Sequence, residues 1–148
     1  MYNTVIRIIP NEMEAEDVVQ EAFIKAFDKL KQYREEASFG AWLKRIMVNT
    51  ALNTLRKSTP VFTDLEVVED TAEEDDWTEP FPNATLIHGA IKELPKGCRV
   101  VFTLHLMEGY PQQVVAEMLN ISESTVKTQY RRAKLFLREK LKPLAYER

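Results

Sequence analysis

The chain has 148 residues, of which 45% are hydrophobic and 29% charged, and a formal net charge of −3; this balance is typical of a soluble globular protein with one domain or two small ones. Its single cysteine, Cys98, excludes an internal disulfide framework and fits a reducing compartment. No apolar run approaches the ~18 residues of a membrane span, and the N-terminus lacks the apolar segment of a signal peptide, so we expect a cytoplasmic protein without membrane insertion.

The first 57 residues have helical apolar spacing throughout. Residues 1–9 form a short apolar piece that ends at Pro10. The next segment, from Glu14, predicts an amphipathic helix because its apolar residues recur at intervals of one and four. The expected inner face consists of Val18, Val19, Ala22, Phe23, Ala26, Phe27 and Leu30. A looser stretch leads to a third helix, in which Trp42 falls on the apolar face and is expected in the core.

Residues 58–85 differ in composition from the parts on either side. They hold nine acidic side chains and no Lys or Arg, and they show no sustained apolar period. We therefore expect a flexible acidic linker between a module at 1–57 and a module at 86–148. The second module carries 11 basic against 6 acidic side chains. Because local charge governs phosphate binding, the acidic total does not exclude a nucleic-acid partner.

The second module is predicted to contain a helix at 99–107, ended by Gly109, and then a helix-turn-helix at 112–141. Asn120 falls at the turn, where Asn tolerates the left-handed backbone conformation. Ser122 follows as the expected N-cap of the second helix. A tight turn between two amphipathic helices is the arrangement that places a recognition helix in the DNA major groove.

The second helix of this pair has an apolar face and a basic face. From Ser122 to Lys142 the chain has seven Lys or Arg against two Glu. A charged face that only meets solvent would more often mix signs, so DNA binding is favoured over an ordinary helical hairpin. The apolar face consists of Val126, Tyr130, Ala133, Leu137 and Leu141, and the basic stripe of Lys127, Arg131, Lys134 and Arg138.

Four segments carry a resemblance to a known family. They are AEDVVQEAFIKAF at 15–27, FGAWLKRIMVNTALNTLRK at 39–57, LPKGCRVVFTLHLMEGY at 94–110 and VVAEMLNISESTVKTQYRRAKLFLREKL at 114–141. In this order the chain resembles the bacterial extracytoplasmic-function (ECF) sigma factors, the two-domain class of RNA polymerase sigma subunits. The resemblance implies an all-α protein that binds core RNA polymerase and promoter DNA and is held in check by an anti-sigma factor. The family's usual first helix, ahead of the piece matching residues 2–9, has no counterpart in this sequence.

The resemblance also assigns roles to the first module. The helix matching 15–30 would dock on a coiled coil of the polymerase's largest subunit, and the loop and helix matching 33–57 would read and open the −10 element. Melted bases need an apolar pocket for stacking and cations for the backbone. The polymerase candidates are Asp17, Gln20, Glu21 and Lys25. The −10 candidates are Tyr33, Arg34, Ser38 and Phe39 for the pocket, with Arg45, Asn49, Asn53, Arg56 and Lys57 along the strand.

The second helix of the helix-turn-helix would enter the major groove of the −35 element. Gln129 is of interest because Gln pairs well with adenine. Arg131 and Lys134 are equally compatible with phosphate contacts, so base and backbone roles stay open for them. The full candidate set is Ser124, Thr125, Lys127, Thr128, Gln129, Arg131, Arg132 and Lys134.

Two other functions compete with promoter-specific initiation. One is a sigma-mimicking regulator that binds an anti-sigma protein, and the other is a helix-turn-helix regulator that works without polymerase. An enzyme is disfavoured, because His88 and His105 have no metal-ligand spacing with Cys98 or with a carboxylate pair. We expect no cofactor and no metal. For the acidic linker we consider two hypotheses: that it limits nonspecific DNA binding, and that it mimics nucleic acid in the polymerase channel.

Overall fold

The computed structural model describes residues 1–58 and 84–145, with side chains as far as residue 143, and the chain divides into two compact units, Met1–Val61 and Phe62–Arg148. Every regular element in the described ranges is helical, so the all-α prediction is confirmed. The expected acidic linker lies almost entirely outside the described residues. In the described ranges, no helix combines the length and the apolar character that crossing a bilayer requires.

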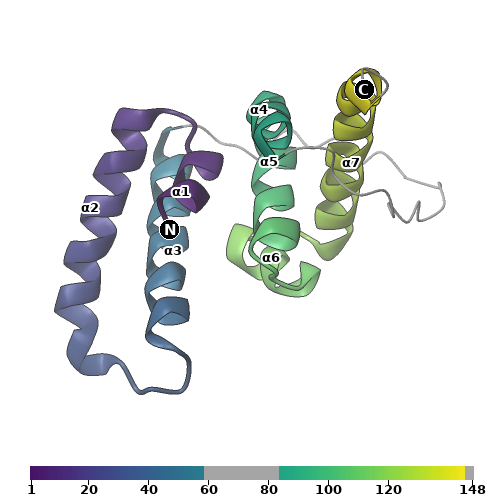
Figure 1. Cartoon of the computed structure of the whole chain (residues 1–148). Coiled ribbons are helices and arrows are strands. Elements are labelled where there is room, and N and C mark those ends of the chain that lie inside the picture. Colours follow the sequence, from purple (N-terminus) through teal and green to yellow (C-terminus); the bar gives the residue numbers. More distant parts are fainter. Residues whose placement is uncertain (59–83, 146–148) are drawn as a thin grey trace. The chain divides into compact units, whose positions relative to one another are not determined.

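In the first unit, residues 1–58 form three mutually packed α-helices (Figure 1), α1 (Tyr2–Ile8), α2 (Glu12–Lys29) and α3 (Phe39–Ser58). A short 3₁₀ turn, Leu30–Gln32, follows α2. The side chain of Asn11 caps α2 by accepting a hydrogen bond from the Glu14 amide at 3.0 Å. The core consists of Val5, Ile8, Ala15, Val18, Ala22, Ala26, Leu43, Met47, Val48, Ala51, Leu52 and Leu55, with Ile9 beside them.

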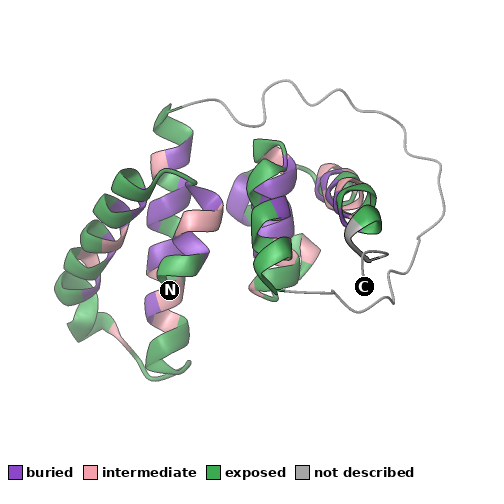
Figure 2. Cartoon of the chain, turned by 45° about the horizontal axis from the view of Figure 1, so that its top comes forward, coloured by how far each residue is buried: buried purple, intermediate pink, exposed green. Residues whose placement is uncertain are grey.

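The inner face of α2 is narrower than its apolar pattern predicts. Three of the four buried residues of this helix are alanines, which lack the bulk to hold α1 and α3 at a distance. Phe23, Phe27 and Leu30 are exposed instead of buried, so their assignment to the core is wrong. These side chains are exposed because, among the α-helices of the first unit's described residues, only α1 and α3 pack against α2. They bury one stripe of α2 and leave its other faces to solvent (Figure 2).

The part of the second unit that the structure describes, residues 84–145, contains four α-helices and one π-helical turn. They are α4 (Ala84–Glu93), α5 (Lys96–Phe102), the π-helix η2 (Thr103–Met107), α6 (Gln112–Leu119) and α7 (Glu123–Ala145). α7 packs against α4, α5 and α6. An apolar cluster joins α4, α5 and α7 through Ala90, Ile91, Leu94, Cys98, Phe102, Ala133, Leu137 and Leu141. An ion pair between Lys140 and Glu93 adds a contact between α7 and α4.

The helix expected at 99–107 is corrected in its details. It begins earlier, at Lys96, and changes from α to π geometry at Thr103. The Glu108 amide donates to the Thr103 carbonyl at 2.9 Å, five residues back, which defines the wider turn. Gly109, at φ 77°, then ends the segment as predicted.

Candidate polymerase and nucleic-acid interfaces

The turn between α6 and α7 has the predicted geometry. Asn120 adopts the left-handed conformation (φ 54°, ψ 48°), and its amide donates to the carbonyls of Ala116 and Glu117. Ser122 Oγ accepts a hydrogen bond from the Thr125 amide at 3.1 Å, which satisfies a donor that the helix start would otherwise leave open. Both expectations are confirmed. The turn therefore fixes where α7 begins relative to α6.

The two faces of α7 separate as predicted. Val126, Ala133, Leu137 and Leu141 are buried. Tyr130 is half-buried, with its ring stacked on Phe102 and meeting His105 edge-on at a centroid distance of 4.7 Å. Burial raises the pKa of Tyr130, so its hydroxyl stays neutral at physiological pH. These contacts hold one face of α7 on the helices behind it.

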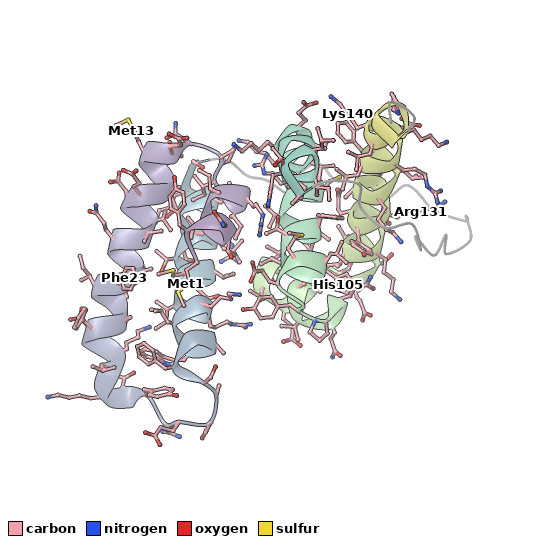
Figure 3. The ribbon with its side chains drawn as sticks, viewed as in Figure 1. Met1, Met13, Phe23, His105, Arg131 and Lys140 are labelled. Carbon is pink, nitrogen blue, oxygen red and sulfur yellow. The ribbon has the colours of Figure 1, made fainter. Side chains whose placement is uncertain are left out.

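The opposite face of α7 carries most of the proposed DNA contacts. Ser124, Lys127 and Arg132 are exposed, whereas Thr125, Thr128, Arg131 and Lys134 are half-buried. Lys127 lies 3.9 Å from Glu123, with both side chains more than half exposed, so solvent weakens this pair and leaves the cation available to phosphate. Figure 3 shows Arg131 extending from α7 on the side away from α5. Lys134 lies 4.8 Å from the centre of the Tyr130 ring.

Gln129 does not belong to this DNA-facing set. Its side chain is 3% exposed, and its Oε1 accepts a hydrogen bond from the Cys98 thiol at 2.8 Å. Val126, Gln129 and Ala133 recur at steps of three and four, which places Gln129 on the face that packs against α5. The prediction that Gln129 reads an adenine is therefore wrong for this structure.

An aromatic cluster lies where the loop after α2 meets the start of α3. Ring centroids are 5.8 Å apart for Tyr33 and Phe39, 5.2 Å for Tyr33 and Trp42, and 5.6 Å for Phe39 and Trp42. The Tyr33 hydroxyl donates to the Ala37 carbonyl at 2.6 Å, which ties the loop together. Trp42 is half-buried in this aromatic cluster and not in the helical core, so its core assignment is corrected.

The loop residues on either side of this cluster are exposed. Arg34 and Ser38 both face solvent, and Ser38 Oγ accepts from the Ala41 amide at 3.2 Å, which caps the start of α3. Glu35 has a positive φ of 58°, a conformation uncommon for a residue other than Gly, Asn or Asp. The loop thus presents its polar groups around three mutually packed rings.

The aromatic cluster continues into a polar stripe along α3. Trp42, Arg45, Asn49, Asn53 and Arg56 recur at steps of three, four, four and three, which is one face of a helix. The four polar members are exposed, and Arg56 Nη1 donates to Asn53 Oδ1 at 3.4 Å. We call these five residues the α3 stripe. Lys57, also exposed, lies beside its end.

The polymerase candidates on α2 are exposed or half-buried. Asp17, Gln20 and Glu21 face solvent, and Lys25 forms a 2.8 Å ion pair with Glu21. The hydrogen bond from Lys25 lowers the pKa of Glu21, with a smaller contribution from the charge of Lys57. Glu21 is therefore fully ionised at neutral pH and available to a cationic partner.

Sequence reasoning missed the apolar part of this surface. Met13, Ile24 and Phe27 are 79%, 64% and 76% exposed. With Asp17 and Gln20 they recur at steps of four, three, four and three, and we call these five residues the outer stripe of α2. Figure 3 labels Met13, a member of this stripe, and Phe23, a further exposed apolar residue of α2. Phe27 was assigned to the core, so the exposed apolar area could be found only once the covering helices were known.

The described residues contain no group of three or more His, Cys, Asp or Glu side chains that could hold a metal ion. His105 Nδ1 lies 2.8 Å from the Tyr110 carbonyl, and because a carbonyl only accepts, the ring donates there. His105 thus stabilises the turn that leads into α6.

The fold and the surfaces described above together define an all-helical protein with a helix-turn-helix of the DNA-binding type.

Comparison with known proteins narrows this class. The family model Sigma-70 region 2 matches residues 1–60, and Sigma-70, region 4 matches residues 84–137. The RNA polymerase sigma-H factor of Pseudomonas aeruginosa is 33% identical over 156 residues, which cover 97% of this chain and 81% of that protein. The ECF RNA polymerase sigma factor SigW of Bacillus subtilis is 31% identical over 157 residues, covering 97% and 84%.

A solved structure has the same fold. The sigma factor RpoE of Bartonella quintana, in complex with the anti-sigma factor NepR, matches with a TM-score of 0.62 and 23% identity over 99% of this chain and 91% of that chain. This chain belongs to the extracytoplasmic-function sigma factors, the subunits that direct RNA polymerase to promoters.

Proposed function

We propose that three described surfaces divide the work of promoter-specific initiation. The outer stripe of α2 and the adjoining Glu21 and Lys25 bind core RNA polymerase. The aromatic cluster and the α3 stripe bind the melted −10 strand, and α7 reads the −35 duplex. The functional modules are residues 1–57 and 86–148. The observation that carries the proposal is the continuity of two features: the aromatic cluster of Tyr33, Phe39 and Trp42 leads directly into the exposed Arg and Asn side chains of the α3 stripe.

Single-stranded DNA explains the α3 stripe better than duplex DNA does. Unpaired bases expose their faces, and stacking on an aromatic side chain contributes about 1–3 kcal/mol per base. Phe39, at 48% exposure, and the half-buried Trp42 offer ring surface for stacking, and Arg45 with Lys57 supplies charge for the backbone. A regulator that binds only duplex DNA has no use for this surface, and a sigma mimic has no use for the basic face of α7.

The chemistry of α2 suits a protein partner. Protein interfaces place apolar and aromatic side chains at the centre and polar groups at the rim. Ile24 and Phe27 are the apolar centre on α2, and Asp17, Gln20 and Glu21 surround them. The corresponding partner surface is apolar with basic residues at its edge.

On α7, Lys127, Arg131 and Arg132 are proposed for base edges or phosphates of the −35 element, with Ser124, Thr125, Thr128 and Lys134 as supporting contacts. Gln129 is left out because it is buried. We also propose an anti-sigma factor as a regulatory partner, since such a partner is bound in the solved structure of similar fold. The protein acts in the cytoplasm as a binding subunit, and the chemistry of RNA synthesis belongs to the polymerase.

The proposal is tested by measuring binding of the full chain to core RNA polymerase. The matched variants are Asp17→Lys with Glu21→Lys on α2, and Glu35→Lys with Glu36→Lys in the loop before α3, which changes the charge equally. We expect tight binding, weakened by the α2 pair and kept by the loop pair. Absence of binding by the unmodified chain, with the helix-turn-helix folded, would instead support a regulator that works without polymerase.

A further inference from the structure

A polar pair lies inside the apolar cluster of the second unit. Cys98 on α5 and Gln129 on α7 are 5% and 3% exposed, and their 2.8 Å hydrogen bond joins residues 31 positions apart. The surrounding residues include Phe102, Ala133 and Leu137, whose contacts are apolar. A buried hydrogen bond in such a setting needs a reason, because an apolar pair would also fill the space.

The donor and the acceptor are defined by chemistry. Burial raises the pKa of the Cys98 thiol, and the nearby charge of Arg132 opposes this only in part. The group is therefore a neutral S–H at physiological pH, and it donates to the amide oxygen of Gln129. Arg132, whose charge acts on the Cys98 thiol and which follows Gln129 by three residues, is one of the exposed side chains proposed for DNA.

The hydrogen bond between Cys98 and Gln129 is directional, whereas the apolar contacts around it are not. Apolar contacts are non-directional and tolerate small rotations of one helix on another. A hydrogen bond weakens steeply with misalignment, and a buried amide that loses its partner is strongly disfavoured. A buried polar pair is known to fix the register of packed helices in this way.

We propose that Cys98 and Gln129 are a positioning pair: their hydrogen bond fixes the rotation of α7 on α5 and so aims Lys127, Arg131 and Arg132 at the DNA. This inference rests on the proposed −35 function of α7. The side chains of a helix reach roughly 6 Å from its axis, so a rotation of about 20° displaces their ends by about 2 Å. That displacement exceeds the tolerance of a hydrogen bond to a base edge.

The position of Gln129 along α7 supports the same role. Thr128 and Lys127 precede it directly, and Arg131 and Arg132 follow within three residues. A constraint at this point controls the DNA-facing half of the helix, whereas the ion pair of Lys140 with Glu93 acts near the far end. Gln129 thus affects DNA recognition without touching DNA.

The test needs a DNA probe that the protein itself selects. The full chain, together with core RNA polymerase, is mixed with short DNA duplexes whose central base pairs are random, and the enriched sequence becomes the probe. Affinity for this duplex is then divided by affinity for a scrambled duplex to give a selectivity ratio. The variants are Cys98→Ala, Gln129→Met, the double variant and the conservative Cys98→Ser, all measured under reducing conditions at a temperature at which each is folded.

We expect each single variant to lower the selectivity ratio about three- to tenfold, the range that loss of one buried hydrogen bond spans. The double variant should lose no more than either single one, and Cys98→Ser should keep the ratio because a hydroxyl still donates. A merely structural pair would lower the thermal midpoint and leave the ratio unchanged, and that result would overturn the inference.

The proposed function has a separate control. Lys127→Ala removes an exposed cation of the DNA-facing set and leaves Cys98 and Gln129 in place. If Lys127→Ala weakens binding while the Cys98 and Gln129 variants keep the selectivity ratio, the −35 role stands and the positioning role fails. If the unmodified chain enriches no sequence, the −35 role fails and the inference fails with it.

Discussion

The two units use apolar side chains in opposite ways on the helices proposed to meet partners. In the first unit, α2 and the start of α3 present Ile24, Phe27 and Phe39 to solvent. In the second unit, α7 buries Val126 and Leu137 and presents mainly cations. Among the side chains of α7 described as far as residue 143, Leu135, at 44% exposure, is the large apolar exception.

The proposed roles account for this difference. A duplex offers phosphates and polar base edges, so a groove-binding helix needs charged side chains on its DNA-facing side. Its apolar residues can be buried against the other helices of the same unit. Unpaired bases and a protein partner offer apolar faces, so the binding helix must leave matching side chains uncovered. Under the proposed roles, burial of apolar side chains on α7 and their exposure on α2 and α3 both match the chemistry of the partner.

The largest effect expected from this comparison concerns stability. Phe102 is fully buried in the second unit, so Phe102→Ala should cost about 3–5 kcal/mol in the free energy of unfolding by leaving a cavity. Phe27→Ala, the same change at an exposed site in the first unit, should cost less than about 0.5 kcal/mol. Denaturant unfolding of the full chain measures both values, and equal losses would contradict the comparison.

Hydrogen exchange of the backbone amides shows which helices the Phe102→Ala variant destabilises. Amides of α5 and α7 should lose protection, while those of α3 should keep it, because the chain forms two compact units. Lost protection in α3 would show that the units unfold together.

The next effect concerns polymerase affinity. Ile24→Asp with Phe27→Asp should weaken binding to core RNA polymerase by about 2 kcal/mol or more, since it places charge in the apolar centre of the proposed interface. Thermal stability should change little because both side chains are exposed. Leu135→Asp makes the same kind of change on α7 and should leave polymerase affinity intact. Full affinity in the α2 variant would remove the outer stripe from the interface.

Patterns among neighbouring residues predicted most of the helices and the turn of the helix-turn-helix. Helical spacing gave α2, α3 and the two helices of the helix-turn-helix, and the chemistry of Asn120 and Ser122 gave the turn between α6 and α7. These features depend on neighbouring residues, which the sequence displays directly. The π-helical turn at Thr103–Met107 was not predicted. A π-helix forms hydrogen bonds between residues five positions apart, and a single turn of it is too short to produce a repeat of apolar residues in the sequence.

Features set by distant residues were the ones predicted wrongly. Phe27 has the spacing of a core residue, and only the number of helices around α2 decides that it is exposed. Gln129 has the chemistry of a base reader, but its side chain is buried against α5, where its hydrogen-bond partner is the thiol of Cys98, 31 residues away in the chain. Sequence periodicity describes one helix at a time, so it predicted which helices are amphipathic and misplaced residues whose exposure depends on other helices.

A smaller effect separates the two kinds of DNA contact. Trp42→Ala should reduce affinity for single-stranded −10 DNA by about 1–3 kcal/mol through lost stacking and leave the salt dependence nearly unchanged. Arg131→Ala should weaken −35 duplex binding, and a phosphate contact would flatten the plot of log affinity against log salt by about 0.9. If Arg131 contacts a base, the slope should persist and selectivity should fall. An unaltered affinity in either variant would remove that residue from its proposed surface.

The smallest effect compares two helix caps with similar geometry. Asn11 Oδ1 accepts from the Glu14 amide at 3.0 Å, and Ser122 Oγ accepts from the Thr125 amide at 3.1 Å. Asn11→Ala and Ser122→Ala should each cost about 1 kcal/mol in stability. DNA affinity should nevertheless fall only for Ser122→Ala, because the first turn of α7 carries Thr125 in the proposed DNA-facing set.

The conservative variant Ser122→Asp tests that reason. Its carboxylate can still accept from the Thr125 amide and favours the positive end of the helix, so stability should return to the unmodified value. A carboxylate beside phosphate is repulsive, so −35 affinity should stay low. Recovery of both properties would mean that the cap acts on DNA binding through folding alone, and that the first turn of α7 lies away from the DNA backbone.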